Sequence, residues 1–147
     1  MLKFIRKING TPRATTTLTL PWSQRTRSRL RVCLDNGEEA GLFLERGIVL
    51  RDGDSLLAED NTVVRIRAAA ETVSTVRCTT PLQLARVCYH LGNRHVDLEI
   101  SEHQVRYPHD HVLDDMVRTM GLTVVVEQAP LEPEAGAYGT EHGHHHG

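Results

Sequence analysis

The stretch that decides the fold is residues 110–121, DHVLDDMVRTMG. Its first residue, Asp110, is a good helix N-cap, and Gly121 is typical of the position just beyond a last helical turn. Between them the apolar residues recur at helical spacing, which predicts one buried helix face: Val112, Leu113, Met116, Val117 and Met120.

A second helix is predicted over residues 80–93, TPLQLARVCYHLGN. Thr80 can cap its N-terminus, Pro81 suits the first helical position, and Gly92-Asn93 can end it in the left-handed conformation. Its apolar face again has helical spacing: Leu84, Val87, Cys88 and Leu91.

Strands are predicted around these two helices, at 74–79, 95–101, 103–108 and 122–128. The resulting order, β-α-β-β-α-β, is that of a ferredoxin-like domain with both helices on one sheet face. A core of about 55 residues is marginal alone, so we expect dimerisation to stabilise it.

The first half of the chain is predicted to be a small all-β sandwich or barrel. Asn36-Gly37 favours a tight hairpin turn between strands at 29–34 and 39–44. Further short strands are predicted at 15–21, 47–50, 55–57 and 62–68.

Four arginines recur at every second position before and within one of these strands: Arg25, Arg27, Arg29 and Arg31. Alternate residues of a strand share a face. The pattern fits a solvated face, a protected sheet edge, or a docking patch for an acidic partner.

Charge also divides the chain. Residues 1–70 carry 12 Lys and Arg against 8 Asp and Glu, whereas residues 71–147 carry 5 against 11. We therefore expect an α+β protein with an all-β domain at 1–71, a ferredoxin-like domain at 72–138 and a flexible histidine-rich tail at 139–147, joined by a short linker within 68–74.

Composition and motifs exclude several classes of function. The chain is 39% hydrophobic and 24% charged, which is typical of a soluble protein, and no apolar run or secretory signal indicates a membrane or export. Three cysteines without a Cys-x-x-Cys pair fit free thiols in the cytoplasm. Few aromatics and a net charge of -2 argue against nucleic acid. Gly-rich phosphate loops, G-x-S-x-G and H-E-x-x-H are absent, so we predict no enzyme.

All nine histidines lie between His90 and His146. His111 opens the helix of residues 110–121, with Asp114 and Asp115 three and four residues later. These carboxylates can approach the imidazole or simply favour the helix N-terminus. Imidazole suits Ni²⁺, Zn²⁺ and Cu²⁺, but one histidine is not a site, and further ligands must come from His109, the tail or a second copy.

The chain ends in EHGHHHG, residues 141–147. The histidines are interrupted by glycine, unlike a purification tag: His142, His144, His145 and His146. The whole segment 129–147 has no periodicity and is expected to be disordered without metal.

Four stretches resemble the family of UreE urease accessory proteins, which are nickel metallochaperones: DNGEEAGLFLERGIVLRDGD (35–54), YHLGNRH (89–95), HDHVLDDM (109–116) and EPEAGAYG (132–139). The resemblance covers nearly the whole chain. It implies an N-terminal domain similar to a chaperone peptide-binding domain and a ferredoxin-like domain that binds metal and forms a homodimer.

The resemblance also implies a function. The family's central metal-binding histidine corresponds to His111, which would face its own copy at the two-fold axis, with the tail histidines adding ligands. Implied partners are the urease accessory GTPase and the apo-urease activation complex, with Ni²⁺ as cargo and Zn²⁺ or Cu²⁺ as competitors. The alternative is a protein that buffers or stores Ni²⁺ or Zn²⁺ without a delivery partner.

Overall fold

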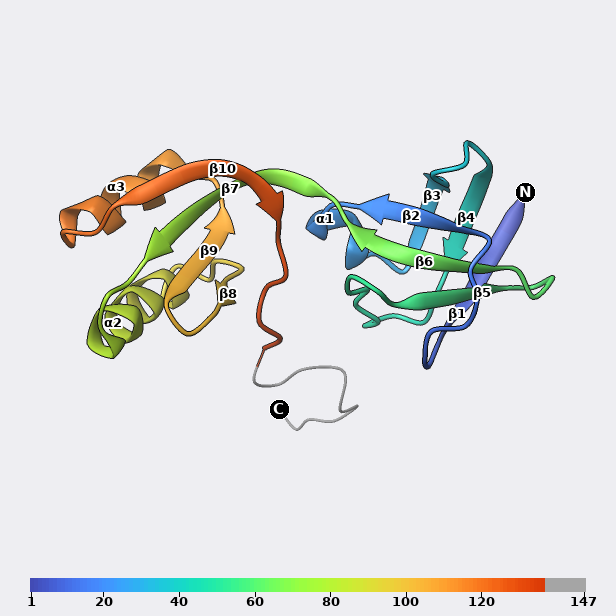
Figure 1. The fold of residues 1–147 in the computed structure, drawn as a ribbon, viewed down its shortest axis with the longest axis horizontal. Helices are drawn as coiled ribbons and strands as arrows, with labels where there is room; N and C mark the ends of the chain where they lie inside the picture. The colour runs from blue at the N-terminus through green and yellow to red at the C-terminus, as the bar shows by residue number, and fades with distance from the viewer. Residues whose placement is uncertain (137–147) are drawn as a thin grey trace. The chain divides into compact units, whose positions relative to one another are not determined.

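A computed structural model describes residues 1–136, which divide into two compact units, residues 1–69 and residues 70–135 (Figure 1). Each unit has its own sheet, so the α+β class is confirmed. The predicted tail, 139–147, lies outside the described residues, and the exact domain limits stay a prediction.

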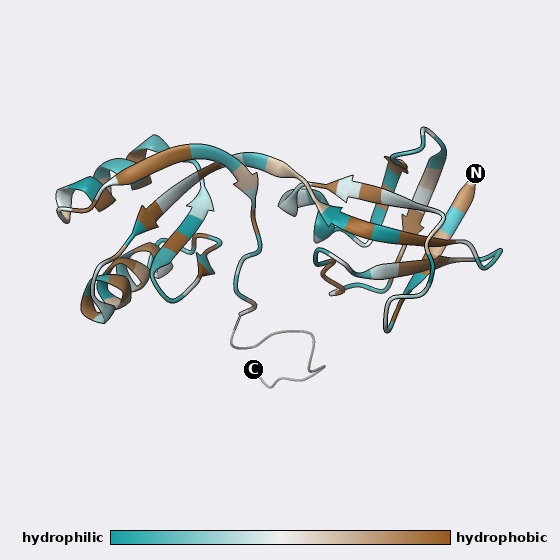
Figure 2. Cartoon of the chain, in the orientation of Figure 1, coloured by the Kyte–Doolittle hydropathy of each residue, from teal (hydrophilic) through white to brown (hydrophobic). Residues whose placement is uncertain are grey.

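The first unit is one six-stranded sheet with a short helix. Its elements are β1 (Leu2–Ile8), β2 (Thr16–Leu20), α1 (Trp22–Arg25), β3 (Arg29–Cys33), β4 (Glu39–Phe43), β5 (Ser55–Ala58) and β6 (Val63–Ala68). The strand order is β2-β6-β5-β1-β4-β3, with β1–β4 and β2–β6 parallel. Hydrophobic and hydrophilic residues alternate along β6 (Figure 2), where Val64 and Ile66 are fully buried.

The hairpin predicted at Asn36-Gly37 is confirmed. The Leu34 N–H donates to the Glu38 carbonyl at 2.8 Å, and Gly37 has a φ of 92°, which glycine adopts without strain. One expectation was wrong: residues 47–50 form no strand, although Leu50 is buried. In addition, the N-terminal strand β1 was not predicted.

The expected arginine face is also wrong for Arg25. A helical turn, α1, interrupts the alternation, and Arg25 is fully buried. Its guanidinium donates to the carbonyls of Leu20 at 3.1 Å and Leu50 at 3.3 Å and stacks on Trp22. Arg25 therefore holds the first unit together instead of facing a partner.

The second unit is a four-stranded antiparallel sheet with two helices. Its elements are β7 (Ala70–Arg77), α2 (Pro81–Gly92), β8 (Glu99–Ile100), β9 (Gln104–Pro108), α3 (His111–Thr119) and β10 (Val124–Pro130), in the strand order β10-β7-β9-β8. Both helices share one core with the sheet, built from Val76, Cys78, Val87, Leu91, Leu98, Val105, Tyr107, Leu113 and Val117. None of the described helices is long and apolar enough to cross a bilayer.

Both predicted helices are confirmed, with their N-terminal caps. The Thr80 hydroxyl accepts from the Gln83 N–H at 3.1 Å, and Asp110 accepts from Val112 and Leu113 at 2.9 and 3.2 Å. The buried face of α3 is narrower than predicted, because Val112 is 51% exposed.

One connection agrees with expectation, and another differs from it. The short linker predicted within 68–74 is the single residue Ala69: β6 ends at Ala68 and β7 begins at Ala70, because the pairing of β7 with β10 extends from Val76↔Val124 to Ala70↔Pro130. The strand predicted to start at residue 95 begins only at Glu99. The left-handed residue beyond α2 is His95, with a φ of 56°, and not Gly92 or Asn93.

Residues 131–134 form a strap across the sheet, although disorder was expected from residue 129 onward. The Glu132 N–H donates to Glu99 Oε1 at 2.8 Å and the Glu134 N–H to the Leu98 carbonyl at 2.6 Å. Leu131 is fully buried. Periodicity fails to predict this segment because the groups that accept its hydrogen bonds belong to β8 and the loop before β8.

Candidate metal centre

The end of β9 and the first turn of α3 bring a histidine and a buried carboxylate together. Asp110 caps α3, which places Asp114 one turn later on the side facing the sheet, where it is 1% exposed. Its Oδ2 lies 3.0 Å from His109 Nδ1, and its Oδ1 accepts from the Tyr107 hydroxyl at 2.6 Å. Ser74 Oγ lies 3.2 Å from the same His109 nitrogen.

Burial also affects the protonation of Tyr107 in this cluster. Burial, followed by the bond to the Asp114 carboxylate, raises the pKa of Tyr107 far above its usual value. The phenol therefore remains a hydrogen-bond donor at physiological pH. The carboxylate can only accept, which places the His109 proton on Nδ1.

This geometry suits a metal ligand. A histidine that binds a metal usually donates its other ring N–H to a carboxylate, which fixes the tautomer and the ring orientation. Asp114 does this for His109, and the His109 side chain is 37% exposed. His109 was predicted as a ligand, but its contact with Asp114 was not predicted, because Asp114 had been considered only in relation to His111.

His111 does not lie beside the carboxylates that were expected to approach it. It is exposed as the first residue of α3. Neither of the two predicted carboxylates bonds its imidazole: Asp114 bonds His109 and Tyr107, and exposed Asp115 pairs with Arg118 at 3.3 Å. The remaining alternative, in which acidic residues favour the helix N-terminus, fits the position of Asp114 in the first turn.

His95, at the start of the strand predicted over residues 95–101, was not among the predicted ligands. It is exposed, and its φ of 56° costs a non-glycine residue about 1 kcal/mol or more. Such strain is often found at functional sites. The feature that singles out His95 is its backbone conformation, which cannot be read from the sequence.

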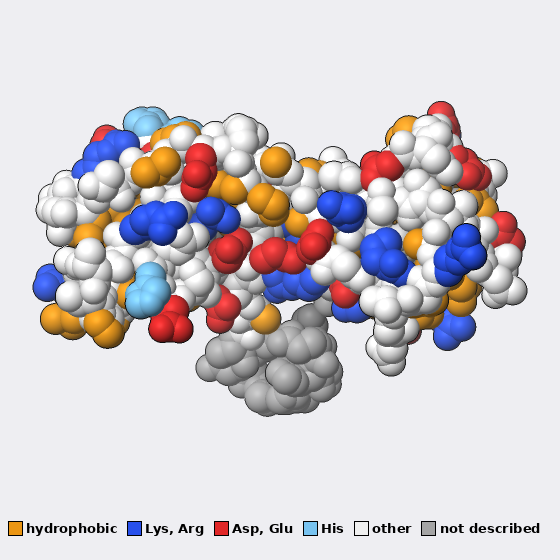
Figure 3. All heavy atoms as spheres, viewed as in Figure 1, with side chains coloured by type: hydrophobic (Ala, Val, Ile, Leu, Met, Phe, Trp, Pro, Cys, Tyr) orange, Lys and Arg blue, Asp and Glu red, His pale blue; other side chains and the backbone are white. Residues whose placement is uncertain are grey.

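One chain does not assemble a complete site within residues 1–136. No group of three or more His, Cys, Asp or Glu side chains there is arranged to hold a metal ion. Figure 3 shows histidines as pale blue spheres on the second unit. Four further predicted ligands lie outside the described residues: His142, His144, His145 and His146.

The comparisons with known proteins cover the whole chain. The N-terminal domain of the UreE urease accessory protein matches residues 2–69, and its C-terminal domain matches residues 71–147. Similar proteins, each named urease accessory protein UreE, occur in Alkalilimnicola ehrlichii (58% identity over 95% of this chain and 85% of the relative), Citrobacter koseri (55%, 100% and 98%) and Proteus mirabilis (57%, 90% and 83%). These names describe an accessory protein and not an enzyme, in agreement with the sequence. The chain belongs to the UreE family of urease accessory proteins.

Proposed function

We propose that this protein is a nickel-binding metallochaperone that delivers Ni²⁺ to apo-urease while the urease active site is assembled in the cytoplasm. The observation that carries the proposal is the family match to both domains of a urease accessory protein. The confinement of all nine histidines to the second half of the chain supports a metal cargo. Nickel is the cargo here and takes part in no reaction.

We propose that the ligands are imidazoles of the second unit and the tail. His111 is the central ligand, His109 is held ready by Asp114, and the tail contributes His142, His144, His145 and His146. Neutral imidazole suits Ni²⁺ and also Zn²⁺ and Cu²⁺, which are the expected competitors. His95 is the alternative central ligand, because its exposed imidazole sits on a strained backbone.

A homodimer supplies the missing ligands in this proposal. Two copies of one imidazole that meet at a two-fold axis give two ligands from one sequence position. Val112, next to His111 in α3, is 51% exposed, and Val125 and Val126 of β10 are 49% and 44% exposed. Apolar side chains left in water on the second unit support dimerisation through it. The order β10-β7-β9-β8 supports a ferredoxin-like assignment for this unit.

The second candidate function is buffering or storage of Ni²⁺ or Zn²⁺ without a delivery partner. The ligands would be the same, so partner dependence separates the two functions. We propose the urease accessory GTPase and the apo-urease activation complex as the partners; the relatives' names support a role beside urease.

The test is nickel transfer. The nickel-loaded full chain is mixed with apo-urease and its accessory proteins, and urease activity is followed in the presence of a chelator that removes free Ni²⁺. A chaperone activates urease under these conditions, and omission of the GTPase abolishes the transfer. If the chelator prevents activation although the protein binds nickel tightly, the protein is a buffer and the delivery proposal fails.

A further inference from the structure

A basic pocket opens on the first unit, between the start of β3 and the loop after β4. It has a volume of about 410 Å³ and is lined by Thr26, Arg27, Ser28, Arg29, Arg46 and Gly47. Three of its six lining residues carry guanidinium groups, and none carries a carboxylate. The pocket therefore concentrates positive charge in a unit that already carries an excess of basic residues.

These guanidinium groups lack acidic partners. In residues 1–136, the ion pairs include Arg31 with Glu39, at 3.7 Å and largely exposed, but none that involves Arg27, Arg29 or Arg46. Like charges gathered at one site repel one another, and an anionic ligand removes that repulsion. Arginine is suited to this role, because its planar fork binds a carboxylate through two parallel hydrogen bonds.

An apolar surface adjoins the pocket. Arg29 belongs to the pocket and also lies 5.3 Å from the centre of the Phe43 ring, while Lys3 lies 5.7 Å from the same ring. Phe43 is 36% exposed, and nearby Met1 is 65% exposed.

Gly41 makes this position of the ring possible. A Cβ atom at residue 41 would lie 2.8 Å from Phe43 Cε2, which is closer than side chains normally approach. The Phe43 ring therefore lies over a glycine of its own strand, next to the basic pocket.

We propose that this surface, defined by Arg27, Arg29, Arg46 and Phe43, docks an acidic segment of a partner protein that carries an apolar side chain beside its carboxylates. The guanidinium groups bind the carboxylates, and Phe43 packs against the apolar side chain. Inorganic phosphate would fill the pocket without using the ring, and a nucleic acid would need more aromatic side chains for stacking than this surface offers. The proposal goes beyond nickel binding and does not depend on it.

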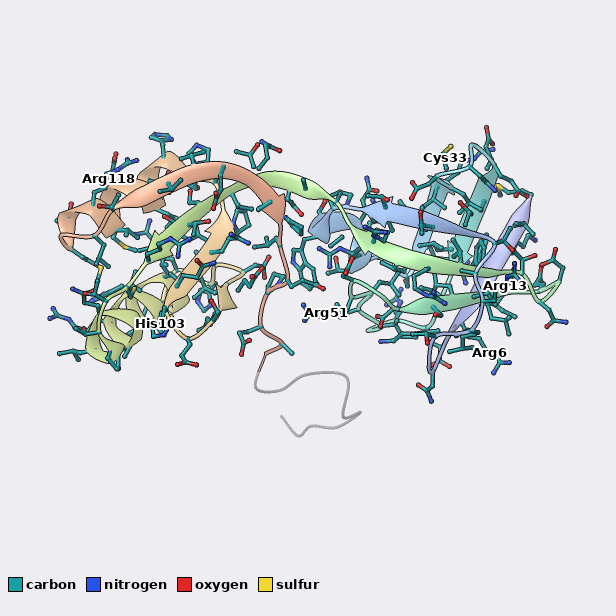
Figure 4. All side chains as sticks on the ribbon, in the orientation of Figure 1. Arg6, Arg13, Cys33, Arg51, His103 and Arg118 are labelled. Carbon is teal, nitrogen blue, oxygen red and sulfur yellow. The ribbon has the colours of Figure 1, made fainter. Side chains whose placement is uncertain are left out.

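The test uses the full chain without metal and a fluorescein-labelled peptide of seven glutamates and two leucines, with fluorescence anisotropy as the readout. We expect Arg29→Gln and Arg46→Gln each to weaken binding about tenfold, because each removes a charge-assisted contact. The matched control is Arg13→Gln, which removes the same charge from the loop before β2 and outside the pocket lining (Figure 4). It should leave the affinity unchanged.

A second peptide, with both leucines replaced by serine, isolates the apolar contact. Phe43→Ala should weaken binding of the leucine peptide and leave that of the serine peptide unchanged. The surface is no docking site if the leucine peptide does not bind, if Arg13→Gln weakens binding as much as Arg29→Gln, or if unlabelled oligothymidylate or inorganic phosphate displaces the labelled peptide better than the unlabelled peptide does. Circular dichroism verifies that each variant is folded. If Phe43→Ala does not fold, Arg46→Gln still tests the proposal.

Discussion

Asp114 is the residue on which the geometry near the proposed metal centre depends. It is almost fully buried, and it joins the Tyr107 hydroxyl to the His109 ring. Burial of a carboxylate costs free energy unless the carboxylate is hydrogen-bonded. Its partners therefore contribute to the stability of the fold as well as to the proposed metal centre. By contrast, His111 and His95 are exposed. Substitutions at these two positions should therefore change metal binding without unfolding the protein.

We predict that His111→Ala abolishes the tight nickel site of the dimer and leaves the fold intact. Isothermal titration with Ni²⁺ measures the loss, and circular dichroism checks the fold. His103→Ala is the control, because it also removes an exposed imidazole from the second unit (Figure 4). Unchanged tight binding in His111→Ala together with its loss in His95→Ala would move the central ligand to His95.

Tyr107 is predicted to make the free energy of unfolding decrease at alkaline pH. In the unfolded chain its phenol ionises near pH ~10, whereas burial and the Asp114 bond raise its pKa in the folded chain. The stabilisation is thus present below pH ~10 and is lost as pH rises further, because only the unfolded state ionises readily.

Urea unfolding at neutral and alkaline pH tests this prediction with Tyr107→Phe. At neutral pH the variant should lose about 1–3 kcal/mol, since Asp114 loses a donor. Above pH ~10 its stability should fall less steeply than that of the wild type. Parallel pH profiles for the two proteins would show that Tyr107 ionises normally in the fold.

At the scale of elements, the strap of residues 131–134 is more than a connection to the tail. It bonds Glu99 of β8 and the carbonyl of Leu98, and it buries Leu131. Arg106 of β9 adds to this attachment, because it bonds the Pro130 carbonyl and pairs with both Glu99 and Glu127. Residues 131–134 are therefore part of the second unit.

We predict that Leu131→Ala destabilises the protein by about 2–4 kcal/mol, because it leaves a cavity where a fully buried side chain stood. Glu134→Ala is the matched control: residue 134 is exposed, and its hydrogen bond to Leu98 comes from the backbone, which the substitution retains. Urea unfolding of both variants decides the question. Equal, small losses would mean that the strap only lies on the sheet.

At the scale of the whole molecule, the two units have separate cores and are joined at Ala69. We predict that a fragment of residues 70–147 folds, dimerises and binds nickel, because β7 begins at Ala70 and all nine histidines are retained. Circular dichroism, light scattering and nickel titration test the three properties. An unfolded or monomeric fragment would contradict the independence of the second unit.

The tail is predicted to raise nickel capacity and to strengthen the central site. Truncation after Tyr138 removes four histidines and should lower both, while the dimer and one bound metal per dimer remain. Imidazole must be neutral to bind, so the tail's contribution should fade as pH drops through about 6.5. Nickel titrations of both proteins at pH ~7.5 and ~5.5 measure this. Identical capacity and affinity at both pH values would make the tail a spectator.

The sequence by itself determined the two helices, the Asn36-Gly37 hairpin and the all-β character of the first half. Their signals are local: Thr80 and Asp110 cap helices within three residues, and Gly37 turns the chain between adjacent strands. Such contacts depend on neighbours in the sequence, so residue type and periodicity are sufficient to predict them.

Only the tertiary structure decided where Arg25, His109 and the strap lie. Arg25 bonds Leu50, 25 residues away, His109 lies beside Ser74, 35 residues away, and Glu134 bonds the carbonyl of Leu98. The backbone strain at His95 likewise appears only once the chain has turned beyond α2. These features depend on which distant segments come into contact when the sheets form. A local pattern of residues does not specify those contacts.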